Sequence, residues 1–193
     1  SRNGRERPAG VCTAAVKEHP MNSFGSSENV CIRYMVNIDL PAVVAIDQAS
    51  WCLAWSEDDF RQQLRRARVL GQVFERGDVI LGYTVYQLDE CAITLLRLAV
   101  DPKQRRGGIG TALVKKLTGR LSAHGRRMLQ ADVHEANLPC HLFLRAVGMK
   151  AVAVMRGWCD DGGDAYRFAC HAAEPEPVEE ASAVNRAWTM RLR

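Results

Sequence analysis

A stretch rich in arginine and glycine, from Arg105 to Gly110, is the part of the chain best suited to binding an anion. It follows an apolar run that ends at Val100, and it precedes a helical pattern of apolar residues. Glycines let the backbone approach a ligand closely, and the first N–H groups of a helix have no partner inside the helix. Together with the positive end of the helix dipole, these groups form an anion site.

The spacing of the glycines narrows the identity of the ligand. The segment lacks the GxxxxGK[ST] pattern of P-loop kinases and ATPases. It also lacks the GxGxxG pattern of dinucleotide-binding folds, because Leu113 stands where the last glycine belongs. What remains is Arg-x-x-Gly-x-Gly, made by Arg105, Gly108 and Gly110, directly after a buried strand.

Alternating strand and helix patterns surround this segment and must position it. Strands are predicted at 31–36, 69–75, 79–87, 91–100, 128–134, 150–156 and 165–170, and helices at 40–50, 56–67, 110–123 and 138–146. Short turns between the early strands imply antiparallel pairing, and the helix at 110–123 implies one parallel crossover. The expected fold class is α+β, a mixed and mostly antiparallel central sheet flanked by helices.

Composition and charge exclude several classes of protein. The chain has 193 residues, of which 47% are hydrophobic and 25% charged, as in ordinary globular domains. No stretch approaches the roughly 18–20 apolar residues of a membrane span. The net charge is +4, and eight basic residues but one acid lie between Asp101 and Gln130. A basic window confined to one segment indicates a local anionic ligand, so we expect neither a nucleic-acid partner nor a membrane contact.

Seven scattered cysteines without a CxxC pair argue against both a disulfide framework and a zinc site. His134, Cys140 and His141 do not have a common zinc-ligand spacing, so no metal is expected. No apolar segment typical of a secretory signal follows the charged residues 1–10. Reduced thiols then indicate a cytoplasmic location.

The two ends of the chain differ in composition from the middle. Residues 1–29 carry glycine, proline, serine and charges without periodicity, and residues 172–193 begin with an acidic, proline-containing stretch. We predict a flexible N-terminal arm over 1–29, one domain over 30–171 and a C-terminal tail over 172–193.

The glycine motif and the order of the elements resemble the GNAT superfamily of acetyl-CoA-dependent N-acetyltransferases, whose pyrophosphate loop has the pattern Q/R-x-x-G-x-G/A. Within it the chain is most similar to the ribosomal-protein-alanine N-acetyltransferase (RimI) group, over about residues 31–170. The segments that carry this resemblance are residues 39–42, 46–48, 55–57, 98–110 and 137–149. It implies the GNAT fold over the domain at 30–171, acetyl-CoA as co-substrate, and a protein N-terminus or a small amine as acceptor.

The resemblance also implies which residues hold the cofactor. Leu98, Ala99 and Val100 would hydrogen-bond the pantetheine arm through their backbones. The loop around the pyrophosphate would consist of Arg105, Arg106, Gly107, Gly108, Ile109, Gly110 and Thr111. Asn137 stands where the side-chain amide contacts the cofactor in that group, and it also fits the N-cap of the next helix.

Amine acetylation needs a base, because an amine is mostly protonated at neutral pH. The resembled group uses a Glu five residues before the Asn, and here that position is Asp132, whose shorter side chain favours a water relay. Asp132 and His134 lie on one face of the predicted strand, so His134 is a second candidate base or a partner that holds Asp132. The alternative interpretation is that Asp132 only pairs with a neighbouring arginine.

The position of the general acid departs from the resembled group. That group has a Tyr four residues before the glycine that ends the next helix, and this chain has Leu144 there. A thiolate can leave without a dedicated acid when positioning and carbonyl polarisation supply the rate. Leu144 therefore affects the expected catalysis and not the expected cofactor site.

Three functions remain open at this stage. The first is acetylation of the N-terminal amine of a ribosomal protein, by direct attack with a carboxylate base. The second is acetylation of a small-molecule amine or a lysine side chain; Glu57, Asp58 and Asp59 would suit a polyamine, although the first turn of a helix explains them equally well. The third is a catalytically weak acetyl-CoA-binding module, which Leu144 and the shortened Asp132 favour.

Overall fold

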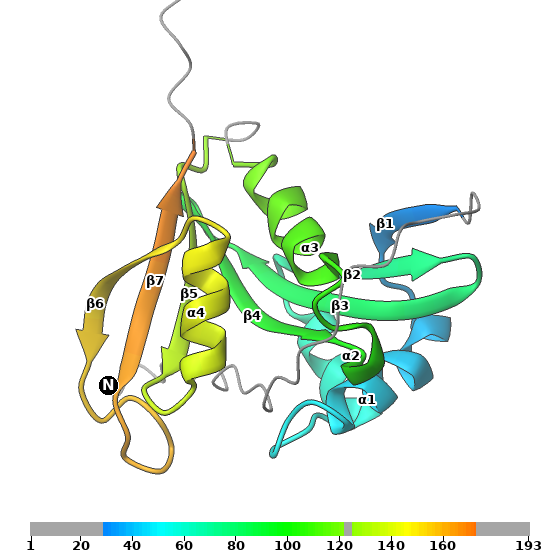
Figure 1. The fold of residues 1–193 in the computed structure, drawn as a ribbon, viewed down its shortest axis with the longest axis horizontal. Helices are drawn as coiled ribbons and strands as arrows, with labels where there is room; N and C mark the ends of the chain where they lie inside the picture. Colours follow the sequence, from blue (N-terminus) through cyan, green and yellow to red (C-terminus); the bar gives the residue numbers. More distant parts are fainter. Residues whose placement is uncertain (1–28, 122–124, 173–193) are drawn as a thin grey trace, which may run out of the picture.

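Residues 29–121 and 125–172, which the computed structural model describes, form one seven-stranded sheet flanked by four α-helices (Figure 1). The strands are β1 Val30–Tyr34, β2 Val69–Arg76, β3 Val79–Leu88, β4 Ala92–Val100, β5 Met128–His134, β6 Lys150–Met155 and β7 Ala165–His171. Their order across the sheet is β1-β2-β3-β4-β5-β7-β6. Neighbouring strands are antiparallel except for β4 and β5, which are parallel, so the expected α+β class is confirmed.

The helices lie on both faces of the sheet. They are α1 Leu40–Gln48, α2 Glu57–Arg65, α3 Ile109–Thr118 and α4 Leu138–Ala146. On β3 the Tyr83 hydroxyl bonds Asp47 of α1, whereas a Cβ at the adjacent Gly82 would meet Ile109 of α3. Successive residues of a strand point to opposite faces, so α1 and α3 cover opposite faces.

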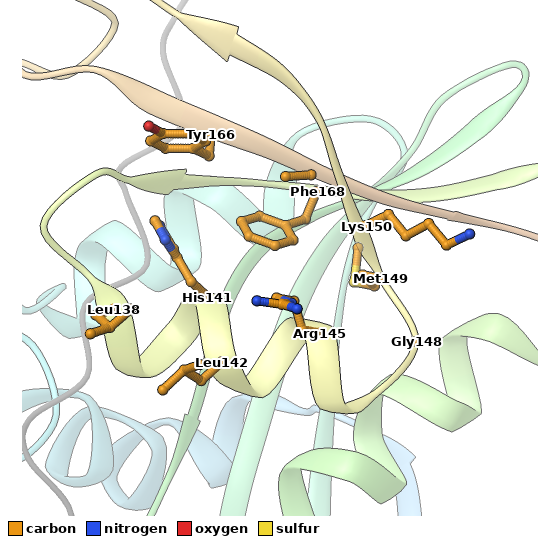
Figure 2. A pocket seen from close by; sticks show the side chains of 10 residues that line it. Leu138, His141, Leu142, Arg145, Gly148, Met149, Lys150, Tyr166 and Phe168 are labelled. Atoms are coloured by element: carbon orange, nitrogen blue, oxygen red, sulfur yellow. The ribbon is translucent and has the colours of Figure 1, made fainter.

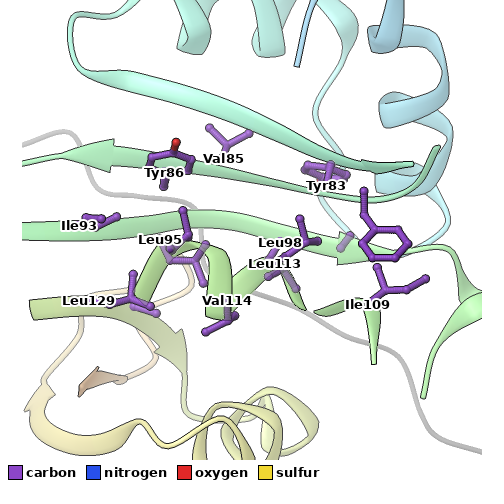
Figure 3. Close-up of a cluster of buried hydrophobic side chains, with 14 of the residues drawn as sticks. Tyr83, Val85, Tyr86, Ile93, Leu95, Leu98, Ile109, Leu113, Val114 and Leu129 are labelled. Atoms are coloured by element: carbon purple, nitrogen blue, oxygen red, sulfur yellow. The ribbon is translucent and has the colours of Figure 1, made fainter. Parts of the chain in front are cut away.

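Apolar side chains from the sheet and α3 form the core beneath the glycine loop (Figure 3). Leu95 and Leu98 of β4 face Leu113 and Val114 of α3, and Leu129 extends this cluster onto β5. Leu113 and Leu129 are completely buried. The first turn of α3, and with it the loop that precedes it, is therefore held at the end of β4 by packing.

The predicted elements are all present, and β5 and α4 have the predicted bounds. The predicted helix at 110–123 differs most from the structure, because α3 ends at Thr118 with Gly119 as its C-cap. Glycine is a poor helix former, and the amide of Leu121 bonds the carbonyl of Thr118, a tighter turn than an α-helix makes. The prediction was too long because apolar residues beyond Gly119 continue the helical spacing.

The predicted arm at 1–29 and tail at 172–193 lie outside the described residues, apart from Asn29 and Ala172. The carbonyl of Asn29 accepts a hydrogen bond from Gly77, and the amide of Ala172 donates one to Arg127. Within residues 29–121 and 125–172, no helix has the length and apolarity needed to cross a bilayer.

An ion pair joins β1 to the start of α1. The guanidinium of Arg33 donates to both carboxylate oxygens of Asp39, at 2.7 and 2.9 Å, and the amide of Val36 donates to the same carboxylate at 2.8 Å. The hydrogen bonds from Arg33, more than any other contact, hold the pKa of Asp39 below its usual value. A lowered carboxyl pKa stabilises the folded state above the unfolded pKa of about 3.9, and this contribution disappears as the pH falls through the folded pKa.

We predict that Asp39→Asn lowers the free energy of unfolding by about 1–3 kcal/mol at pH 7, because Arg33 loses a charged acceptor. The difference from the wild type should shrink as the pH falls below about 4 and the wild-type carboxylate becomes protonated. Urea unfolding at pH 7, 5 and 3 measures this. The exposed Asp78→Asn serves as control, and a loss of stability that is equal at all three pH values would contradict the prediction.

Candidate active site

β4 and β5 are paired over only part of their length. The pairs run from Ala92 with Met128 to Leu95 with Ala131, and from there the two strands separate (Figure 1). One cause is a bulge between β3 and β4: Leu95 faces Tyr86 and Arg97 faces Val85, which leaves Leu96 as an extra residue. A bulge bends its strand. Residues 96–100 thus present a backbone edge to a gap between β4 and β5.

The glycine loop lies at the wide end of this gap. Asp101 caps the short turn after β4 by accepting from the amide of Lys103 at 2.9 Å. Gly108 is the N-cap of α3 with a φ of +80°, a left-handed conformation that favours glycine. The first N–H groups of α3 have no partner within the helix. The loop therefore has the geometry of the anion site that the sequence predicts.

Gly110 has a second role, which concerns packing. A Cβ at this position would lie 3.2 Å from the ring of Phe143 on α4. The absence of a side chain lets α3 and α4 approach each other across the gap. Gly110 therefore fixes the distance between the two helices that border the gap.

The two arginines of the loop have different environments. Arg105 turns back into the domain, where Nε donates to the carbonyl of Val100 at 3.2 Å and Nη2 donates to Oγ of Ser50 at 2.8 Å. Burial lowers the pKa of Arg105. Arg106 is exposed and has a φ of +67°. Arg106 is thus the side chain free to approach an anion from solvent, whereas a contact from Arg105 would involve its backbone.

Asp132 forms a bidentate ion pair across the sheet. Its two carboxylate oxygens accept from Nε and Nη2 of Arg167, at 2.7 and 2.8 Å. The two residues are directly opposite each other on β5 and β7, and Asp132 is only 9% exposed. The hydrogen bond with Asp132 raises the pKa of Arg167. The sequence allowed for an arginine partner but did not identify Arg167, because only the strand register places it there.

The partner that holds Asp132 is Arg167, and the expectation that His134 has this role is wrong. Nδ1 of His134 accepts from the amide of Ala136 at 3.0 Å, and Nε2 lies 3.0 Å from the carboxylate of Asp161. Because Nδ1 accepts, the proton is on Nε2 and points to Asp161. To act as a base, His134 would have to give up one of these bonds.

His134, Cys159 and Asp161 bring three ligand atoms within 4.8 Å of one another. A histidine that binds a metal usually donates its other N–H to an oxygen, whereas here the other nitrogen accepts. Burial, and next the neighbouring Asp161, raise the pKa of the Cys159 thiol and favour its protonated form. The cluster has the chemistry of a hydrogen-bonded turn and not that of a cation site.

Asn137 is the N-cap of α4, as its neighbours in sequence suggest. Its Oδ1 accepts from the amide of Cys140 at 3.2 Å, and the residue is 6% exposed. The contact of its side-chain amide with the cofactor stays a prediction. Leu144, on the same helix, packs in the core at 1% exposure. It provides no proton donor.

The structure also contains a buried ion pair, between α1 and β4, that the sequence did not predict. Arg97 of β4 donates to both oxygens of Asp47 on α1, at 2.7 and 2.8 Å, and both side chains are completely buried. Its guanidinium lies over the rings of Trp51 and Trp55, at 4.0 and 4.5 Å from their centroids. A single arginine within an apolar strand and a single aspartate within an apolar helix were signals that could have revealed this pair.

A cavity of about 510 Å³ lies on the other side of α4, away from the gap (Figure 2). His141 of α4 packs against the rings of Tyr166 and Phe168 of β7, and Arg145 and Lys150 line the cavity beside them. None of the predicted site residues lines this cavity. The gap between β4 and β5 is therefore the better candidate, because Asp132 lies where it begins and the glycine loop lies at its wide end.

Comparisons with known proteins agree with this geometry. The model of the acetyltransferase (GNAT) family matches residues 40–149, more than half of the chain. The [ribosomal protein bS18]-alanine N-acetyltransferase of Escherichia coli (strain K12) is 29% identical over 139 residues, which cover 72% of this chain and 87% of the relative. The corresponding enzyme of Salmonella typhimurium (strain LT2) is 26% identical over 127 residues, covering 66% and 85%.

Solved structures share the fold. The crystal structure of the ribosomal-protein-S18-alanine N-acetyltransferase from Escherichia coli aligns with a TM-score of 0.67 and 25% identity, covering 76% of this chain and 96% of that one. The structure of yncA from Salmonella typhimurium with its cofactor acetyl-CoA aligns with a TM-score of 0.61 at 17% identity, covering 77% and 96%.

We predict that Gly108→Ala weakens acetyl-CoA binding by about tenfold, because a left-handed alanine costs about 1–2 kcal/mol and shifts the loop. Isothermal titration calorimetry measures the affinity, and thermal unfolding measures the stability. Gly125→Ala is a matched control, since Gly125 has a φ of +74° and, like Gly108, nothing within 4 Å of an added Cβ. Equal weakening of binding in both variants would contradict the assignment of the loop.

Proposed function

The chain belongs to the acetyltransferase (GNAT) family, and from this premise we propose that it acetylates the N-terminal α-amine of a protein, as its relatives named for ribosomal protein bS18 do. It is an N-acetyltransferase that uses acetyl-CoA. The observation that carries the choice of acceptor is the match to these relatives over 87% of their length.

The gap between β4 and β5 fits acetyl-CoA in this proposal. Backbone groups of Leu98, Ala99 and Val100 form the edge available to the pantetheine arm, because β5 has separated from β4 at this level. Residues 106–111 offer N–H groups and the exposed Arg106 to the pyrophosphate. The cofactor supplies an activated acetyl thioester, and the protein must supply a neutral amine at the thioester carbon.

Asp132 is the proposed base. It follows Ala131, the last residue of β5 that pairs with β4, so it lies where the gap begins. The bidentate bonds from Arg167 fix the orientation of the carboxylate and leave one lone pair on each oxygen. Since Asp132 is one methylene shorter than the Glu of the resembled group, a water molecule would carry the proton from the amine to the carboxylate.

The departure of the thiolate takes place without a tyrosine from α4, because Leu144 fills that position in the core. Catalysis then depends on holding the amine and the thioester together and on backbone N–H groups near the carbonyl oxygen. We expect a lower turnover than in an enzyme that has an acid at this position.

The acids that would suit a polyamine are already used within α2. Asp59 forms a capping box with Ser56, whose hydroxyl and amide both donate to the Asp59 carboxylate, and the bond from the hydroxyl is the main cause that lowers the pKa of Asp59. Glu57 and Asp58 pair with Arg61. This arrangement favours a protein acceptor over a polycation.

We predict that a peptide that begins with a free alanine releases thiol from acetyl-CoA. The same peptide with a blocked N-terminus and an added lysine should not, because the α-amine has the lower pKa and is more often neutral. A thiol-release assay at saturating acetyl-CoA measures both, with spermidine as a third acceptor. Faster release from the lysine peptide or from spermidine would contradict the proposed acceptor.

We predict that Asp132→Asn lowers kcat by about 10²–10⁴-fold and leaves acetyl-CoA affinity unchanged, because the amide oxygen can still accept one hydrogen bond from Arg167 but the side chain can no longer take up a proton. Steady-state kinetics and calorimetry measure the two effects. Asp132→Glu, which restores the longer acid, should remain active. Asp161→Asn removes the charged partner of His134 and is the control for a role of His134 as the base. A larger loss in Asp161→Asn than in Asp132→Asn would assign the base to His134.

A further inference from the structure

Two arginines from the cofactor side of the gap reach the segment that connects α1 and α2. We call residues 49–56 the α1–α2 loop. Arg105, from the glycine loop, donates to Oγ of Ser50 at 2.8 Å. Arg97, from β4, donates to the carbonyl of Leu53 at 2.7 Å. The glycine loop thus contacts the α1–α2 loop near its start, and β4 contacts it at its centre.

The contact from Arg97 is the fixed one. Its guanidinium is completely buried between Trp51 and Trp55 and pairs with Asp47, whose carboxylate also accepts from the amide of Trp55 at 2.6 Å. Two buried donors of this cluster, Nη1 of Arg97 and Nε1 of Trp51, find no acceptor within residues 29–121 and 125–172. The bonds to Asp47 and to the carbonyl of Leu53 therefore hold the α1–α2 loop firmly against β4.

The contact from Arg105 is the one that responds to the cofactor. Arg105 is half-buried, and its Nε also donates to the carbonyl of Val100, the last residue of β4. It is followed directly by Arg106 and the glycines proposed to bind pyrophosphate. A ligand that fixes the glycine loop therefore fixes the guanidinium of Arg105 and, through it, Ser50.

The α1–α2 loop lies on the same face of the sheet as Asp132, the proposed base. Thr94 pairs with Gln87 of β3, and Arg97 pairs with Val85. Because Gln87 and Val85 are two residues apart, the side chains of Thr94 and Arg97 point to the same face of the sheet. This is the face that α1 covers, since Arg97 bonds Asp47. The side chain of Gln130 donates to Thr94 at 2.8 Å, which places it on the same face. Asp132 shares this face with Gln130 by alternation. The loop and the proposed base thus border the gap from the same side.

The tip of the loop is apolar and exposed although its backbone is anchored. The side chain of Leu53 is 80% exposed, while its carbonyl accepts from the buried Arg97. The tip of the loop is therefore anchored through its backbone while its side chain is open to solvent.

We propose that Arg105 is a positioning residue that links the glycine loop to the α1–α2 loop, so that bound acetyl-CoA stabilises the α1–α2 loop in the form that receives the acceptor amine. This inference rests on the proposed function, because it takes the gap as the cofactor site. Acetyl-CoA and the acceptor then assist each other's binding, and the coupling is equal in both directions.

Hydrogen–deuterium exchange of the full chain, with and without acetyl-CoA alone, tests the link without an acceptor. In the wild type, acetyl-CoA should slow the exchange of amides in residues 49–56 by about fivefold or more. Arg105→Gln should lose this protection and keep the protection of residues 107–111. Ser50→Ala should give the same loss, and the double variant should lose no more than either single variant.

Two arginine variants are controls. Arg106→Gln should weaken acetyl-CoA binding but retain protection of the α1–α2 loop at saturating acetyl-CoA. Arg126→Gln removes a half-buried arginine that donates to the carbonyl of Asp89, away from the gap, and should leave the protection unchanged. At saturating acetyl-CoA, Arg105→Gln should raise the KM of the alanine peptide by about tenfold. Because the coupling is reciprocal, calorimetry should show that the peptide no longer tightens acetyl-CoA binding in this variant, whereas the affinity for acetyl-CoA without peptide stays near that of the wild type.

The outcomes separate the link from the function on which it rests. Wild-type protein that gives no calorimetric heat with acetyl-CoA overturns both. Binding without protection of residues 49–56, or an Arg105→Gln variant in which only the KM of acetyl-CoA rises, overturns the link and assigns Arg105 to the cofactor. Binding and protection without turnover of any peptide supports the link and overturns the acceptor.

Discussion

The separation of β4 from β5 after a short parallel pairing is the constraint on which the rest of the site depends. Parallel strands pair evenly when both are regular, but the extra residue Leu96 bends β4 away from β5. Backbone groups that would otherwise bond a neighbouring strand become available to a ligand. The glycine loop follows at the end of β4, so the same bend also determines where the anion site lies.

The buried pair between Asp47 and Arg97 holds the other border of this gap. Taking two charges out of water is costly, and the attraction between them compensates only when the geometry is good. Here the bonds are bidentate, and two tryptophan rings cover the guanidinium. The hydroxyl of Tyr83 also donates to Asp47, and burial is the main cause that raises the pKa of Tyr83. Removing one partner would leave a buried charge, so the pair fixes α1 to β4.

Asp132 and Arg167 show how one contact serves both structure and chemistry. The ion pair joins β5 to β7, which are adjacent in the sheet. It also orients a carboxylate at the start of the gap, where a proposed base has to be. A longer Glu could extend past such a pair toward a substrate, whereas Asp is held close to the strand. In the proposed function, catalysis would therefore depend more on orientation and on the cofactor loop than on a freely placed acid or base.

The sequence by itself determined the elements and the glycine loop. Periodicity, capping residues and turns are local signals, so β5 and α4 could be predicted to the residue, and the Arg-x-x-Gly-x-Gly spacing located the loop before α3. Only the tertiary structure decided which side chains meet. Arg167 lies 35 residues from Asp132, Arg97 lies 50 from Asp47 and Arg105 lies 55 from Ser50. These contacts depend on strand register and on the packing of α1 against the sheet, which no local pattern encodes.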